Sequence, residues 1–158
     1  MHALFHRRQR ERGQSLAEFA LVAPVAIALL AAIIQFGVVF WAQNTLTQVV
    51  RDTGRWAATQ GNCSDPAPVV TQSQAIAASS ALIGYSTTNY VPTATWDSAT
   101  CPVDNSTVNY VHVTATQIVP TFFPGMEYLP LLGTCSPPPT GCHITLSSTA
   151  QFRMEPNP

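Results

Sequence analysis

The longest hydrophobic stretch of this chain runs from Phe19 to Trp41, and only Pro24, Gln35 and Gly37 interrupt it. A helix rises 1.5 Å per residue, so these 23 residues would extend roughly 35 Å, against about 30 Å for the hydrocarbon core of a bilayer. The pattern therefore predicts a membrane-spanning helix. A cleaved secretory signal peptide is the main alternative, but the stretch is longer than the usual apolar core of such leaders.

Helical periodicity continues beyond the predicted span, from Ala42 to about Gln60. Arg51 and Arg55 fall on one side, while apolar and small residues share the other side at 3.6-residue spacing. We expect this stripe to pack on the protein's own C-terminal part, and lateral packing on neighbouring subunits is a compatible alternative. Its members are Ala42, Leu46, Val49, Val50, Thr53, Trp56 and Ala57.

The rest of the chain carries one more helical pattern and several strand patterns. Asp65-Pro66 predicts the start of an Ala-rich helix near Val69–Ile83, closed by Gly84. Period-two alternation predicts strands at 110–119 and 144–153. A shorter strand is expected around 90–96, and the proline-rich segment 120–139 is expected to form a loop at the sheet edge.

These elements predict an α+β fold. A long N-terminal transmembrane and stalk helix is followed by a small head with a short helix and an antiparallel sheet of three or four strands. Three regions follow from this prediction. They are a basic leader at 1–13, the transmembrane and stalk helix at 14–60, and an extracytoplasmic head at 61–158.

Charge is distributed unevenly along the chain. Only 9% of the residues are charged, compared with roughly 25% in soluble globular domains. Residues 1–13 hold four arginines and one glutamate, a net charge of +3, whereas residues 14–158 hold three arginines and seven acids, a net charge of −4. Because positive flanks stay on the cytoplasmic side, we predict a cytoplasmic N-terminus and an exported head. Three scattered arginines after residue 13 argue against binding to nucleic acid.

A short motif lies between the basic leader and the apolar stretch. Glu18 is a carboxylate at the expected membrane edge, five positions after Gly13. A cut between Gly13 and Gln14 would make Glu18 the fifth residue of the mature chain. This arrangement resembles the processing site of type IV pilin-like proteins, which implies cleavage by a prepilin peptidase with the apolar helix left attached. Gly13 has no side chain, so an extended backbone there can approach a protease site closely.

Glu18 is chemically unusual at this place. A carboxylate at the start of an apolar helix is costly unless it is paired or reaches water. The α-amino group released at Gln14 would be positively charged near neutral pH. The pilin resemblance implies that the carboxylate of one subunit meets the amine of its neighbour and helps to set the stacking register. Alternatively, Glu18 lies among lipid headgroups and stabilises the helix start through the helix dipole.

The resemblance extends to one family in particular. The segments GQSLAEFALVAP at 13–24, QFG at 35–37, QNTL at 43–46 and VRDTGRWAA at 50–58 are similar to TadE-like minor pseudopilins of tight-adherence pilus systems. Members commonly show Glu-Phe-Gly where this chain has QFG, so one intramembrane acid of that pattern is missing. The similarity covers about residues 12–60. It implies as partners a membrane, the prepilin peptidase, other pilins or pseudopilins and pilus assembly proteins.

Four cysteines lie in the predicted exported part, where disulfides form and persist. Three complete pairings are open. We prefer Cys63–Cys101, which would tie the end of the stalk to the sheet, together with Cys135–Cys142, which would close a short loop. A metal site of Cys135, Cys142 and His143 is the alternative, but the cysteine spacing is wide for zinc and no second histidine lies nearby.

The sequence predicts no catalytic site and no cofactor. His112 and His143 are the only histidines of the predicted exported part, and no nucleophile elbow, Cys–His signature or phosphate-binding glycine loop accompanies them. We expect a non-enzymatic, minor pseudopilin-like component of tight-adherence pilus assembly, held in the cytoplasmic membrane by one helix. The alternatives are an unprocessed single-pass protein with an extracytoplasmic binding domain and a secreted enzyme with a cleaved signal peptide.

Overall fold

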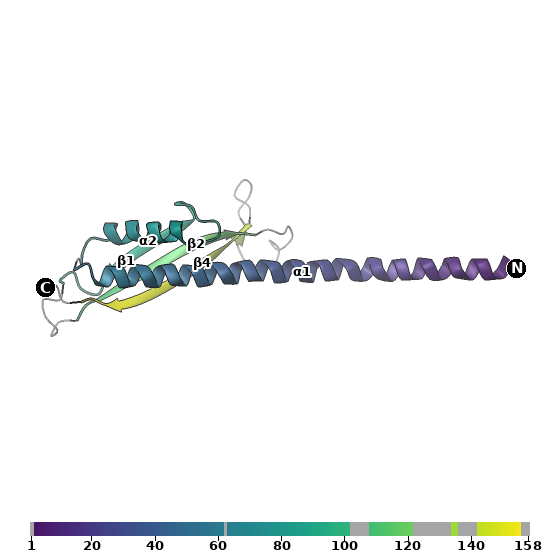
Figure 1. Ribbon diagram of the computed structural model, residues 1–158, viewed down its shortest axis with the longest axis horizontal. Coiled ribbons are helices and arrows are strands. Elements are labelled where there is room, and N and C mark those ends of the chain that lie inside the picture. The colour runs from purple at the N-terminus through teal and green to yellow at the C-terminus, as the bar shows by residue number, and fades with distance from the viewer. Residues whose placement is uncertain (1, 62, 102–107, 122–133, 136–141, 156–158) are drawn as a thin grey trace. The chain divides into compact units, whose positions relative to one another are not determined.

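The computed structural model describes residues 2–61, 63–101, 108–121, 134–135 and 142–155. Most of the predicted loop at 120–139 therefore lies outside the described residues. The elements are α1 (His2–Ala58), α2 (Ala67–Ser79), β1 (Tyr90–Trp96), β2 (Tyr110–Pro120), β3 (Thr134–Cys135) and β4 (Cys142–Arg153) (Figure 1). The chain divides into two compact units, Met1–Gly37 and Val38–Pro158.

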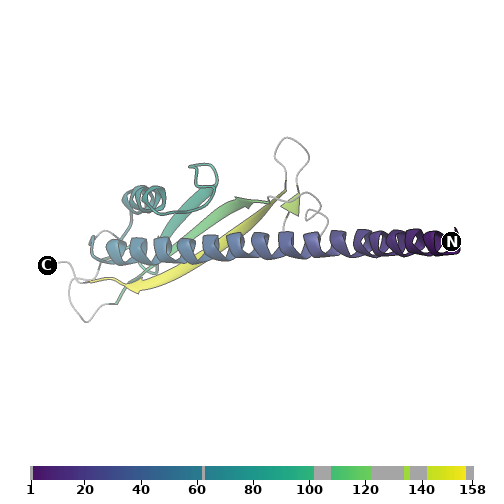
Figure 2. The same ribbon diagram turned by 45° about the vertical axis from the view of Figure 1, so that its right-hand side comes forward.

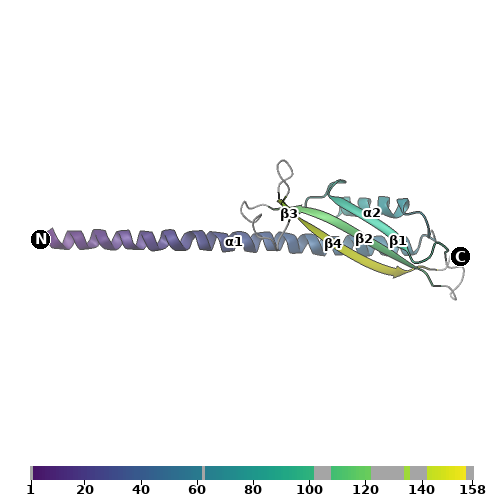
Figure 3. The same cartoon turned by 180° about the vertical axis from the view of Figure 1, so that it is seen from behind.

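The sheet of the second unit is antiparallel, with the strand order β1-β2-β4-β3. The predicted strands at 90–96, 110–119 and 144–153 are all present, and the α+β class is confirmed. In Figure 1, α2 and the part of α1 that belongs to this unit lie in front of the sheet. Figure 3 shows the opposite face from behind, with the strands in front of both helices. The head therefore has two layers, helices on one side and an open sheet face on the other.

Alternation of side chains explains the two faces of the sheet. Along β2, the residues at odd positions from Val111 to Val119 are buried, and the residues between them are partly exposed. The open face carries mostly hydroxyl side chains, and Thr114 and Thr149 hydrogen-bond across it through their Oγ1 atoms at 2.9 Å. One apolar face packed beneath helices and one polar face open to solvent is the usual arrangement of an antiparallel sheet.

β1 is an edge strand, and Pro92 protects its free edge. The amide of Asp97 donates to the carbonyl of Tyr110 at 3.2 Å, so the backbone N–H and C=O groups of the odd-numbered residues of β1 point toward β2. The backbone nitrogen of Pro92 therefore points to the free edge, where its missing proton costs no hydrogen bond within the sheet. It also offers no donor to an invading strand.

The stalk stripe packs against the head's own sheet. Ala42, Leu46, Val49, Val50, Thr53 and Ala57 are all buried at 1% exposure or less. Arg51 and Arg55 on the other side of the helix are exposed. This confirms the preferred of the two predictions for the stripe. Packing thus groups residues 38–58 of α1 with the head.

Gly54 allows α1 to approach β4 closely. A Cβ atom built on Gly54 would overlap the ring of Phe152. Side-chain bonds support the same contact further along the strand, where Gln43 Nε2 donates to the Ser147 carbonyl at 3.1 Å. The glycine is therefore a packing requirement rather than a weak point of the helix.

The second helix is shorter than predicted. It begins at Ala67, whose amide donates to Asp65 Oδ1 at 2.9 Å, and it ends at Ser79 rather than near Ile83. Ser80 is already extended, and Gly84 lies in the following turn with φ +72°. Glycine favours positions just after a helix, which is why the sequence predicts a helix end at Gly84. Gly84 instead serves the turn that leads into β1. In Figure 2, α2 is seen nearly end-on beside β1.

Tyr90 and Ser73 form a buried hydrogen bond between β1 and α2. Their hydroxyl oxygens lie 2.6 Å apart, and both residues are fully buried. Burial raises the pKa of the Tyr90 phenol, and the bond to Ser73 opposes this rise only in part. The pair joins α2 to the edge of the sheet.

The variant Tyr90→Phe tests this pair. It should lower the free energy of unfolding by about 1–2 kcal/mol at neutral pH, because Ser73 loses its partner. Above about pH 10 the unfolded phenol ionises while the buried one stays protonated, so the wild type loses stability as the pH rises through this range. The variant should lose less over the same range. Urea titrations at pH 7 and pH 11 measure both effects, and equal losses for the two proteins would contradict the assignment.

Candidate membrane anchor and assembly segment

The first unit is an apolar helix with its side chains turned outward. The stretch of α1 that begins at Ser15 is long and apolar enough to cross a membrane. Its large side chains are 57–75% exposed. They are Leu16, Phe19, Leu21, Val22, Val25, Ile27, Leu29, Leu30, Ile33, Ile34 and Phe36. An apolar surface of this extent is costly in water, which makes a bilayer the natural surrounding.

A cleaved signal sequence near an N-terminus has the same composition as a membrane anchor. The residues that follow the apolar stretch distinguish the two. α1 does not end after the apolar residues but continues to Ala58 as one helix. Its last turns supply buried residues to the core of the second unit, Leu46 and Val50 among them. Removing the apolar stretch as a leader would cut this helix.

The predicted processing site lies inside α1. The backbone is helical at Gly13 and Gln14, whereas a protease site binds an extended backbone. Cleavage of this form therefore requires the helix to unwind locally before a protease can hold the chain. Glycine has the lowest helix propensity of any residue except proline, so Gly13 is a suitable place for that opening.

Glu18 lies one helical turn after Gln14. Residues four apart share one face of a helix, so an amine at position 14 and the carboxylate at position 18 would project from the same side. Glu18 is exposed, and so are its apolar neighbours Leu16 and Phe19. The helix thus presents one carboxylate on an otherwise apolar surface.

Two exposed aromatic side chains follow the apolar helix. Phe40 is 61% exposed and Trp41 is 54% exposed, at the start of the second unit. Aromatic rings of this kind are enriched where a membrane helix meets the water interface. They agree with the predicted outer end of the span near Trp41.

The structure forms the disulfide Cys63–Cys101, with the two Cα atoms 5.3 Å apart. This is the pairing that we preferred from the sequence. Cys135 and Cys142 are directly opposite each other in the β3–β4 register. Their side chains lie outside the described residues, so the bond between them stays a prediction.

In the described part of the head, His112 pairs with an aspartate. His112 Nε2 lies 2.8 Å from Asp97 Oδ1 on the open sheet face, and both side chains are substantially exposed. Within the described ranges, no group of three histidine, cysteine or acidic residues is arranged to hold a metal ion. The alternative metal site used Cys135 and Cys142, whose side chains are not described.

The fold and the helix together define a class of protein, with one N-terminal helix suited to a membrane and a small α+β head. The family model described as TadE-like protein matches residues 13–55. The match confirms the TadE-like resemblance for this segment and supports a component associated with tight-adherence pili. No curated protein and no solved structure matches the chain.

The matched segment combines both roles of α1. It begins at Gly13 and includes Glu18, the apolar helix and most of the stripe that packs on the head. Sequence reasoning identified these features because each follows a helical period or a local motif. It missed the contact between Gly54 and Phe152 and the hydrogen bonds of Asn109, because both join residues far apart in the chain. For the Gly54–Phe152 contact, a glycine inside a regular helical pattern was the one signal that the sequence offered.

Proposed function

We propose that this protein is a minor pseudopilin-like subunit of a tight-adherence pilus, processed by a prepilin peptidase between Gly13 and Gln14. The observation that carries the proposal is the position of Glu18. It lies five residues after Gly13 on an exposed apolar helix, inside the segment that matches TadE-like proteins. A head with its own hydrophobic core, to which the last turns of the same helix contribute, supports a subunit role. We further propose that the head lies outside the cytoplasm and has no catalytic activity.

Processing would change the charge at the end of the helix. Hydrolysis of the peptide bond between Gly13 and Gln14 consumes one water and leaves a carboxylate on Gly13 and an amine on Gln14. The released leader takes away a net charge of +3, which otherwise holds the helix end at the cytoplasmic surface. The mature helix keeps one amine and the Glu18 carboxylate near its start.

These two groups would then direct assembly. A carboxylate surrounded by apolar side chains in a bilayer or fibre is costly unless a cation pairs with it. The amine of a neighbouring subunit is a suitable partner, because every mature copy carries one. Pairing between copies would favour one axial stagger of the helices and disfavour the others.

The variant Glu18→Gln tests the proposal. It should be processed at Gly13 like the wild type but be recovered in sheared pili at about one tenth of the wild-type amount or less, since loss of a charge-assisted bond costs about 1.5–3 kcal/mol. Glu155→Gln, the same change at an exposed site of the head, is the matched control and should assemble normally. Immunoblots of membrane and sheared fractions give both quantities. Normal assembly of Glu18→Gln would contradict the proposed pairing.

A further inference from the structure

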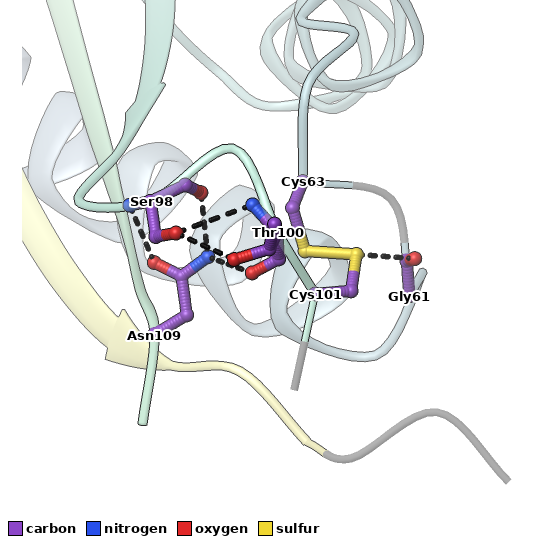
Figure 4. The surroundings of a disulfide bond; sticks show 6 residues. All are labelled: Gly61, Cys63, Ser98, Thr100, Cys101 and Asn109. Atoms are coloured by element: carbon purple, nitrogen blue, oxygen red, sulfur yellow. Dashed lines mark hydrogen bonds between the residues drawn. A yellow bond between two sulfur atoms is a disulfide. The ribbon is translucent and has the colours of Figure 1, made fainter. Parts of the chain in front are cut away.

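The Cys63–Cys101 disulfide joins the end of the stalk helix to the turn before β2, in the surroundings shown in Figure 4. α1 ends at Ala58, and Gly61 follows with φ +63°, a left-handed conformation that turns the chain toward Cys63. Cys101 Sγ lies 2.8 Å from the Gly61 carbonyl oxygen. Once oxidised, this sulfur has no proton to donate, so the contact does not by itself hold Cys101 in place.

Asn109 holds the turn that carries Cys101. Its side-chain oxygen accepts from the Ser98 amide at 3.0 Å. Its side-chain nitrogen donates to the carbonyls of Ser98 at 2.7 Å and Thr100 at 3.1 Å. Asn109 is only 2% exposed, whereas its partners Ser98 and Thr100 lie in an exposed turn. The residue directly before Cys101 is thus fixed by a buried amide.

Asn109 is also linked to the end of α1, which precedes Cys63. The Met154 amide donates to the Asn109 carbonyl at 2.8 Å, and the next amide, of Glu155, donates to the Ala58 carbonyl at 3.1 Å. The chain just after β4 therefore ties Asn109 to the last residue of α1. Both cysteines are placed by one framework, which exists only when the strands and the helix end have come together.

Chain statistics alone do not distinguish Cys63 from Cys135 as the partner of Cys101. Cys63 and Cys101 are 38 residues apart, and Cys101 and Cys135 are 34 residues apart. Loop-closure entropy makes these two pairings differ by only about 1.2-fold in an unfolded chain. As long as Cys135 is not already bonded to Cys142, the folded structure must supply the discrimination.

We propose that Asn109 is the positioning residue that selects Cys63 as the partner of Cys101, so that this disulfide closes after β2 and β4 have formed. In the reaction, two thiols lose two protons and two electrons to a disulfide oxidant. With glutathione disulfide as the oxidant, the products are the protein disulfide and two molecules of glutathione. The inference does not depend on the pilus function.

The variant Asn109→Asp tests this role with almost no change in size. A carboxylate cannot donate to the carbonyls of Ser98 and Thr100, so it repels the groups that the amide binds. Full-length protein in detergent micelles is reduced and then equilibrated with glutathione redox buffers, and peptide mass mapping identifies the bonds. The effective concentration of the Cys63–Cys101 pair should fall at least tenfold. Bonds from Cys101 to other cysteines should appear.

Asn89→Asp is the matched control, because Asn89 Nδ2 donates to the Gly84 carbonyl at 3.3 Å, in an exposed position. It should keep the wild-type pairing and an effective concentration within twofold. Wild-type pairing at wild-type effective concentration in Asn109→Asp would overturn the proposal. If that variant does not fold, oxidation of a Cys142→Ser protein in strong urea decides the matter, because Cys135 then has no near partner. The proposal expects comparable amounts of Cys63–Cys101 and Cys101–Cys135 there, and dominance of Cys63–Cys101 in urea would overturn it.

Discussion

Replacing Cys63 and Cys101 together by serine is expected to lower the free energy of unfolding of the head by about 4 kcal/mol. The bond closes a loop of 38 residues, and loop-closure entropy gives about this value at 25 °C. The loop contains α2 and β1, so its release loosens an edge strand and a covering helix together. For a domain with a stability of 5–15 kcal/mol this is a large fraction of the total.

Urea unfolding of the full chain in detergent micelles measures the loss, through the fluorescence of Trp56 and Trp96, which pack against the core. A reductant added to wild-type protein should produce at least the same loss. A reductant added to the double-serine variant is the control, because any remaining change reports a bond between Cys135 and Cys142. A double-serine variant as stable as the wild type would show that the bond does not constrain the head.

Replacing Gly54 by leucine is expected to cost about 3 kcal/mol or more. Even one added carbon would overlap the ring of Phe152, and overpacking of an interior contact costs about 1–3 kcal/mol. Leucine adds three further carbons, so its overpacking cost is larger still. This cost exceeds the gain of about 1 kcal/mol from the better helix propensity of leucine. α1 would have to move away from β4, and this movement would expose the apolar stripe of α1 that is buried against the sheet.

Two further variants identify the cause of this loss. Gly37→Leu makes the same change in the same helix at a site where no atom lies within 4 Å of the new Cβ, and it should leave the stability of the head unchanged. Phe152→Ala removes the ring that the leucine would meet, so Gly54→Leu should cost less in a Phe152→Ala protein than in the wild type. Equal costs in the two backgrounds would place the strain elsewhere.

The parts of the fold that follow a period were predictable from the sequence. The apolar stretch, the stripe from Ala42 to Ala57 and the alternation in β2 and β4 each repeat over many residues, and the structure contains all of them. The end of α2 was not predictable. Ile83 continues the apolar pattern and Gly84 resembles a helix stop, but the turn into β1 requires the positive φ of Gly84 instead.

The candidate site divides in the same way. Gly13, Gln14 and Glu18 were identified from a local motif and its resemblance to known processing sites. The helical backbone at Gly13 was not expected, because the motif describes what a protease binds rather than what the intact chain forms. Asn109 was missed because its partners at positions 98–100 are brought to it by the turn before Cys101, which no sequence pattern marks.

The most direct test of the proposed function is the N-terminus of the mature protein in its native membrane, determined by intact mass and terminal-peptide analysis. Strains with and without the prepilin peptidase gene should be compared. The proposal predicts a chain that begins at Gln14, as the free amine or its cyclised pyroglutamate form, and a chain that keeps residues 1–13 when the peptidase is absent. A protein that keeps Met1 in both strains, or that begins beyond the apolar stretch, would contradict it.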